Sequence, residues 1–370
     1  MIDQTILKNE ERAVYTLRSL YNRFGYRPYK MSKFEEYDFY AKNKDFLISD
    51  GILTFTDKAG KLLALKPDVT LSIVKNSKDG AGALEKYYYN ENVYRVTQRT
   101  HNFNEIMQTG LECIGDVDLY ACTEVLMLAV KSLVLLHEEC VLDLSHAGLV
   151  SALLEEITES SDARAKVSEA IVRKSSDVVK VLAQEGSIRE ENAALAALLM
   201  NEYRTADEMK NALASLVKSG KALTALDEFY EILKALESLS LGKYLNVSFS
   251  LPAGAGYYSG VMFQGYIKGI PDRVLSGGRY DGLMKKLGKR AGAIGFAVYL
   301  DSLERFGEEM KEYDVDILLL KDKDVKPSDV VLAIEKLSAD GSTVSVQSTI
   351  SEDIRYRRLV KLGVNGWEEA

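Results

Sequence analysis

Gln108 and Glu112 are the residues whose types and spacing best suit the binding of a polar ligand. They lie four positions apart in EIMQTGLECIG, a segment rich in apolar and β-branched residues that predicts a strand. Side chains at even spacing along a strand project to one side, so both can face a single pocket. The spacing by itself places both side chains on one face and assigns them no ligand.

Histidines and cysteines could bind a metal, but their spacing argues against it. No histidine has a close partner of the HExxH kind, and the cysteines show neither paired disulfide spacing nor close metal-ligand spacing. Free thiols are typical of a reducing compartment. We therefore expect no metal and no cofactor. The residues considered are His101, His137, His146, Cys113, Cys122 and Cys140.

The elements expected around this strand alternate between helix and strand. A leading helix with apolar residues at helical spacing should end at Gly25. Residues 51–65 predict a hairpin with AGK as its turn, and KYYYNENVYRV predicts a strand that pairs with the one carrying Gln108. Residues 119–136 predict a helix. Strands return in residues 244–306.

Two other regions differ in composition from this core. Residues 147–242 contain no proline and are rich in Ala, Leu, Glu and Lys, which predicts a helical insert. Its last helix should bury one stripe, made of Leu223, Leu226, Tyr230, Leu233 and Leu236. Residues 311–370 predict a small α/β unit in the order strand, helix, strand, helix, with SEDIRYRRLVKLG as the second helix.

Composition limits the class of protein. The 370 residues predict two or three domains, and 46% apolar residues are enough for sizeable cores. Lys and Arg number 47 and Asp and Glu number 55, a net charge of -8 that argues against a bulk electrostatic grip on nucleic acid or anionic membrane. The sequence has no uninterrupted run of about 18 apolar residues, so we expect no membrane span. We expect a cytoplasmic protein.

Four segments in order resemble the class II histidyl-tRNA synthetase core. They are FTDKAGKLLALKPDVT, YYYNENVYRVTQRTHNFNEIMQTGLECIG, AGAGYYSG, and SGGRYDGLMKKLG with GAIGFAVYLDSL. The resemblance implies an α+β fold with a class II synthetase-like antiparallel sheet core in residues 1–146 and 243–310. It also implies that residues 311–370 are a truncated anticodon-binding-like α/β domain.

The same resemblance implies a pocket for histidine. Asp68 and Thr70 match residues that hold an α-amino group, and a carboxylate and a hydroxyl suit an ammonium. Arg95 matches an arginine that holds a carboxylate or an α-phosphate. An acid beside tyrosine hydroxyls suits an imidazole, whose two nitrogens need a donor and an acceptor. The implied histidine-binding residues are Asp68, Thr70, Arg95, Gln108, Glu112, Tyr257 and Tyr258.

Three positions depart from the synthetase pattern where ATP would bind. Thr97 replaces a glutamate that recognises adenine, and Ala253 and Ser302 replace arginines that contact phosphates. Neither alanine nor serine can substitute for a guanidinium. A chain that keeps the residues for histidine and loses those for ATP resembles the regulatory subunits of ATP phosphoribosyltransferase, paralogues of the synthetase without aminoacylation activity.

That resemblance implies a non-catalytic protein. It would support a short-form catalytic subunit, mediate feedback inhibition by histidine, and form a homodimer within a hetero-octamer. No tRNA partner is expected, because residues 313–370 hold 8 basic and 11 acidic residues, a poor surface for an anticodon stem. A divergent histidyl-tRNA synthetase and another synthetase-like histidine-binding paralogue are the alternatives.

Overall fold

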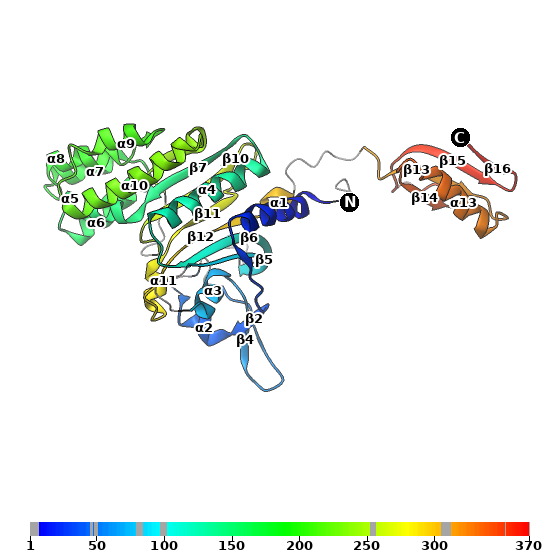
Figure 1. The fold of residues 1–370 in the computed structure, drawn as a ribbon, viewed down its shortest axis with the longest axis horizontal. Helices are drawn as coiled ribbons and strands as arrows, with labels where there is room; N and C mark the ends of the chain where they lie inside the picture. The colour runs from blue at the N-terminus through cyan, green and yellow to red at the C-terminus, as the bar shows by residue number, and fades with distance from the viewer. Residues whose placement is uncertain are drawn as a thin grey trace. The chain divides into compact units, whose positions relative to one another are not determined.

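The structure is a computed structural model that describes residues 7–44, 47, 51–78, 84–96, 102–251, 257–304, 312–351 and 353–369, without the side chains of residues 302 and 304. The chain divides into two compact units, Met1–Phe306 and Gly307–Ala370. Figure 1 shows the elements of each. The units are described separately below.

A nine-stranded sheet is the centre of the first unit. Its order is β1-β5-β6-β12-β11-β10-β7-β9-β8. Neighbours are antiparallel except for two parallel pairs, β1 with β5 and β7 with β9. The strands are β1 (Arg27–Pro28), β5 (Glu85–Val96), β6 (Phe103–Gly115), β7 (Cys140–His146), β8 (Glu202–Tyr203), β9 (Leu245–Ser248), β10 (Val261–Ile267), β11 (Leu275–Arg279) and β12 (Gly292–Tyr299). The expected α+β class with an antiparallel core is confirmed.

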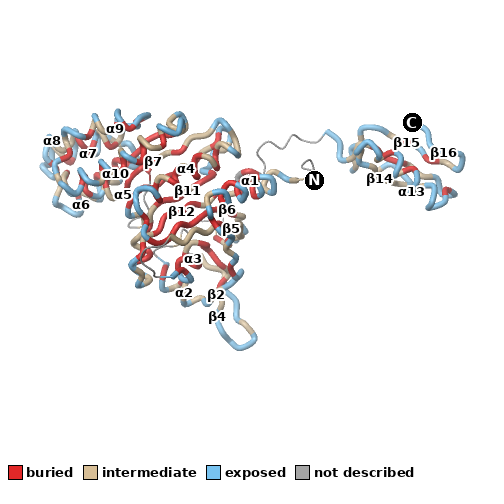
Figure 2. The backbone as a smooth tube through the Cα atoms, viewed as in Figure 1, coloured by how far each residue is buried: buried red, intermediate tan, exposed pale blue. Residues whose placement is uncertain are grey.

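Other elements cover both faces of this sheet, and the side chains of β6 point alternately to one face and to the other. Leu111 and Cys113 join the larger apolar core on one face, whereas Ile114 joins a second core on the other face, where Ile106 packs against it. This two-residue alternation follows from strand geometry. Figure 2 shows the buried strands between the covering elements.

Two helices cover the first face. Helix α1 (Asn9–Arg23) ends before Gly25, whose φ of 80° few other residues adopt, as expected. Helix α4 (Leu119–Leu136) has the expected bounds, and its N-cap Asp118 accepts a hydrogen bond from the Ala121 amide at 2.8 Å. By length and composition alone α4 could cross a membrane, but 56% of it is buried in this core, and a core helix passes the same test.

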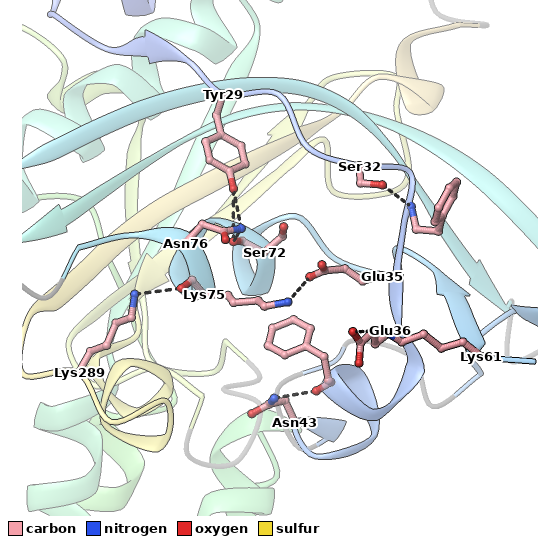
Figure 3. A network of polar contacts seen from close by, with 12 residues as sticks. Tyr29, Ser32, Glu35, Glu36, Asn43, Lys61, Ser72, Lys75, Asn76 and Lys289 are labelled. Atoms are coloured by element: carbon pink, nitrogen blue, oxygen red, sulfur yellow. Dashed lines mark hydrogen bonds and ion pairs between the residues drawn. The ribbon is translucent and has the colours of Figure 1, made fainter. Parts of the chain in front are cut away.

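A three-stranded sheet and three short helices cover the second face. The sheet, ordered β2-β4-β3, contains the predicted hairpin, whose turn includes Gly60 at a φ of 82°. Helix α3, which begins at Thr70, is held by side-chain contacts from two neighbouring segments. Lys75 pairs with Glu35 of β2, and Asn76 donates to the hydroxyl of Tyr29, which follows β1 (Figure 3). The elements are β2 (Phe34–Glu36), α2 (Tyr37–Ala41), β3 (Thr54–Thr56), β4 (Leu62–Leu65), α3 (Thr70–Asn76) and α11 (Asp281–Lys286).

Residues 147–238 form a block of helices that packs into the first core. The predicted helical insert consists of helices and their connections except at β8, a strand of two residues that pairs with β9. The predicted stripe on its last helix is wrong at Leu223, which is 40% exposed, while Phe229 and Ile232 are fully buried on α10. The buried stripe is therefore rotated relative to the predicted one. The helices are α5 (Ala147–Ile157), α6 (Ser161–Val172), α7 (Ser176–Gln184), α8 (Glu190–Leu198), α9 (Ala206–Leu213) and α10 (Gly220–Ser238), followed by the 3-10 turn η3 (Gly242–Tyr244).

The second unit is a small α/β sheet, ordered β14-β13-β15-β16. The predicted strand, helix and strand are β13 (Val315–Lys321), α13 (Pro327–Leu337) and β14 (Val344–Gln347). The predicted second helix is wrong, because its segment forms β15 (Tyr356–Gly363), parallel to β13, and continues into β16 (Gly366–Glu369). Val360 and Leu362, two positions apart, are buried in this unit's core, which is strand periodicity.

Candidate functional site

A cavity opens on the second face of the nine-stranded sheet. Its walls surround about 410 Å³ of space, part of which is open to solvent. Strands β5, β6, β11 and β12, the turn before α3, and the segment before β10 supply the walls. All seven residues predicted for a histidine site line it, namely Asp68, Thr70, Arg95, Gln108, Glu112, Tyr257 and Tyr258.

Glu112 is the buried acid of this cavity, with an exposure of 1%. The Thr70 hydroxyl donates to Glu112 Oε1 at 2.7 Å, and the Tyr280 hydroxyl donates to Oε2. Burial raises the pKa of Glu112 to about 8, although the bonds from Tyr280 and Thr70 favour the charged form. The carboxyl group can therefore hold a proton near neutral pH, and a cationic or proton-donating ligand would favour its ionised form.

The backbone of β12 makes room for this carboxyl group. Gly295 lies opposite Glu112 in the β6–β12 pairing, and a Cβ at Gly295 would overlap the Glu112 Oε2 atom. The absence of a side chain is therefore required by close approach. A Cβ at Gly277 on β11 would likewise overlap the Gly295 carbonyl oxygen and the Phe296 side chain. The close approach of β11 and β12 therefore requires glycine at both positions.

Asp68 and Arg95 form a second charged group at the cavity wall. Arg95 Nη2 lies 3.7 Å from Asp68 Oδ2, and Arg95 Nε donates to the Pro67 carbonyl at 2.9 Å. The Leu71 amide donates to Asp68 Oδ1 at 2.9 Å. Burial raises the pKa of Asp68, and the Arg95 guanidinium opposes that rise. One carboxylate oxygen thus faces a cation while the other is bound at the start of α3.

Gln108 supplies a donor that has no partner among the described residues. Its side chain is 2% exposed, and within the described residues its Nε2 has no hydrogen bond. Gln108 pairs with Tyr299 across β6 and β12, and the Tyr299 hydroxyl bonds Ser276 Oγ at 2.7 Å. An unpaired buried donor costs about 1–3 kcal/mol. A ligand acceptor placed here would remove that cost.

Tyrosine rings form most of the remaining wall. The rings of Tyr257 and Tyr258 lie 4.8 Å apart at 78°, and the Tyr280 ring lies 6.1 Å from Tyr257. Burial, followed by the nearby carboxylates, raises the pKa of Tyr257 well above its usual value, and the same causes act on Tyr89 and Tyr280. The phenols are therefore neutral, so each can donate a hydrogen bond.

Sequence reasoning missed four polar residues of the cavity, which are Tyr89, Ser276, Tyr280 and Tyr299. Tyr89 could have been found, because it shares a strand face with Tyr87 and Val93 in KYYYNENVYRV. Ser276 and Tyr299 could not, because only strand pairing across β11, β12 and β6 brings them to Gln108.

Of the three positions that depart from the synthetase pattern, the structure describes only the backbone of one. Thr97 and Ala253 lie outside the described residues, and Ser302 lies in α12 (Asp301–Glu304), where its side chain is not described.

Among the residues that the structure does describe, no group of three or more His, Cys, Asp or Glu side chains could hold a metal ion. The described cavity can hold a cation between two acids and an anion beside Arg95 and Gln108.

Comparison with solved structures identifies the class to which this fold belongs. A chain from Bacillus halodurans C, described as an ATP phosphoribosyltransferase regulatory subunit/histidyl-tRNA synthetase, superposes with a TM-score of 0.76 at 23% identity, over 96% of this chain and 94% of that one. The histidyl-tRNA synthetase of Nostoc sp. PCC 7120 gives a TM-score of 0.71 at 15% identity, over 96% and 88%. The fold is therefore that of a histidyl-tRNA synthetase-like class II core.

Sequence comparison is more specific. The family model for histidyl-tRNA synthetase matches residues 4–303. The ATP phosphoribosyltransferase regulatory subunit of Clostridium kluyveri is 30% identical over 318 residues, which are 83% of this chain and 81% of the relative. The histidine–tRNA ligase of Methanocaldococcus jannaschii is 27% identical over 341 residues, 90% and 80%. The chain belongs to the histidyl-tRNA synthetase family and, within it, to the regulatory subunits of ATP phosphoribosyltransferase, which are named as regulatory and not catalytic.

Proposed function

We propose that this chain is the non-catalytic regulatory subunit that assembles with a short-form ATP phosphoribosyltransferase catalytic subunit, the enzyme of the first step of histidine biosynthesis. The carrying observation is the 30% identity to the Clostridium kluyveri regulatory subunit over 83% of this chain. A chain of the ATP phosphoribosyl transferase complex from Thermotoga maritima shares the fold, with a TM-score of 0.62 at 19% identity over 79% of this chain and 97% of that one.

The effector in this proposal is histidine, bound in the Glu112 cavity. Its ammonium would lie at Asp68 and Thr70, and its imidazole between Glu112 and the phenols of Tyr257 and Tyr258. The carboxylate of the ligand would then meet Arg95 and Gln108, where the unpaired Nε2 can donate. This arrangement pairs each polar group of the ligand with a buried partner of opposite character.

The same proposal includes a homodimer of this chain within a hetero-octamer, in the cytoplasm. It includes neither tRNA nor a cofactor. The acidic character of residues 313–370 supports the omission of tRNA.

Co-expression with a short phosphoribosyltransferase tests the assembly. We expect the two chains to co-purify, the catalytic chain to gain activity over its isolated form, and histidine to inhibit the pair. Glu112→Gln should weaken inhibition while the chains still co-purify. A catalytic chain that neither binds this protein nor changes its rate would contradict the proposal.

A divergent histidyl-tRNA synthetase is the second candidate, favoured by the 27% identity to the Methanocaldococcus jannaschii ligase over 90% of this chain. Against it stand Thr97, Ala253 and Ser302, which cannot supply the glutamate and two arginines of the synthetase pattern. Histidine-dependent exchange of pyrophosphate into ATP would establish the synthetase. If histidine binds but neither activity is found, the chain is another histidine-binding paralogue.

A further inference from the structure

Arg279 and Tyr280 are adjacent residues that reach opposite faces of the nine-stranded sheet. Tyr280 lies in the second core, and its hydroxyl donates to Glu112 in the cavity. Arg279 is the last residue of β11, where Leu275, four positions earlier, lies in the first core with the helices. Even spacing places Arg279 on that helical side. Two adjacent residues, Tyr280 and Arg279, thus connect Glu112 to the helical side of the sheet.

The Arg279 side chain joins the core sheet to the last helix of that block. Its Nη1 lies 3.8 Å from Oε1 of Glu228 on α10, and its Nε donates to Asp281 Oδ2 at 2.9 Å. Glu228 Oε1 also lies 4.0 Å from Nε2 of His146, the N-cap of α5. Glu228 therefore lies between a cation of the sheet and the start of the block.

Two hydrogen bonds tie Arg279 and Asp281 to the segment that carries the cavity tyrosines. The Ser259 amide donates to the Arg279 carbonyl at 2.8 Å, and the Asp281 amide donates to Ser259 Oγ at 3.1 Å. Ser259 directly follows Tyr257 and Tyr258. Both sides of the cavity, Glu112 and the tyrosine segment, therefore bond to residues 279–281.

We propose that Arg279 is the positioning residue through which ligand occupancy of the Glu112 cavity reaches the helical block of residues 147–238, by way of Glu228 on α10. The inference rests on the proposed histidine site and adds the route by which that site changes another surface. A ligand that bonds Glu112 displaces or tightens Tyr280, and the adjacent Arg279 transmits the shift to α10. The two contacts on this route, Glu112 with Tyr280 and Arg279 with Glu228, are both present in the structure, so the route is physically continuous.

Hydrogen exchange of the full chain, with and without histidine, tests this route. In the wild-type protein, histidine should slow amide exchange in β6 and, by roughly fivefold, in α10. Arg279→Gln should keep the effect in β6 and lose it in α10, with histidine binding weakened roughly fivefold. Glu228→Gln, which alters only the helical side, should do the same, and the double variant should lose no more than either single one.

Asp227→Asn is the matched control. Asp227 neighbours Glu228 on α10 but pairs with Lys210 of α9 at 3.0 Å, so it should leave the histidine effect on α10 intact. If α10 stays protected in both Arg279→Gln and Glu228→Gln, or if their effects add, the route is wrong. Protection in wild-type β6 without protection in α10 also overturns the route but leaves the histidine site standing. No histidine effect anywhere overturns both.

Discussion

The Tyr280 hydroxyl donates a hydrogen bond to Glu112 Oε2, and both side chains are buried on the same face of the nine-stranded sheet. Thr70 donates to the other oxygen of that carboxyl group at 2.7 Å. Two neutral donors therefore hold a group whose burial disfavours its charge. This balance makes Glu112 sensitive both to a ligand and to pH, and each sensitivity can be measured.

Histidine should raise the melting temperature of the wild-type protein, because a ligand that binds only the native state stabilises it by mass action. At a concentration about 100 times its dissociation constant the gain is about 2.7 kcal/mol. Glu112→Ala should abolish the shift, since the imidazole loses its buried acceptor. Differential scanning fluorimetry with histidine and with alanine measures the effect. A wild-type protein unmoved by millimolar histidine would show that this cavity does not bind it.

Stability should fall as pH rises through the window set by Glu112. An unfolded glutamate titrates near about 4.3, whereas burial raises the pKa of folded Glu112 to about 8. Between these values the native state keeps a proton that the unfolded chain has lost, so the free energy of unfolding decreases with pH. Each pKa unit corresponds to about 1.4 kcal/mol.

Urea unfolding of wild-type protein and Glu112→Gln between pH 5 and 8.5 measures this contribution. The variant cannot ionise, so its advantage over the wild type should grow with pH across the window. Burial also raises the pKa of Asp68, which is present in both proteins, so Asp68 enters the difference only through its charge repulsion with Glu112. A difference that stays constant with pH would mean that Glu112 titrates alike in both states.

The strand carrying Gln108 and Glu112 was predictable because its information is local. Alternating side chains on one strand assign the two residues to one face whatever the partner strands are. The partners of these residues were not predictable in this way. Tyr299 reaches Gln108 through the pairing of β12 with β6, a contact between distant parts of the chain. Propensity and spacing hold no information on such a register.

The segment of β15 shows the opposite failure. The order strand, helix, strand, helix predicts a helix over residues 351–363. In the structure this segment instead pairs with β13 and β16, and the pairing buries Val360 and Leu362. The tertiary context therefore decides the conformation of this segment.

Gly295→Ala should damage the cavity more than an ordinary glycine substitution would. The new Cβ would overlap Glu112 Oε2, so either the carboxyl group or β12 must move. We expect a loss of about 1–3 kcal/mol of stability from overpacking and the loss of histidine binding. Gly220→Ala is the control, since its Cβ meets nothing within 4 Å at the start of α10. The control should be neutral or stabilising by less than about 1 kcal/mol. Equal effects at the two positions would rule out the steric account.

Removing Lys66 should leave a costly unpaired acid beside the cavity turn. Lys66 Nζ pairs with Glu91 on β5, and the two side chains are 2% and 16% exposed. Lys66→Met should destabilise the protein by about 3 kcal/mol, because Glu91 then loses its cation in a poorly solvated place. The double variant Lys66→Met with Glu91→Leu should recover most of that loss, since no charge remains to be paired. Lys61→Met, which breaks the exposed pair with Glu36 (Figure 3), should leave the unfolding midpoint unchanged. Chemical denaturation of the wild type and these three variants measures the differences, and a double variant no more stable than Lys66→Met would show that packing, not the buried charge, sets the cost.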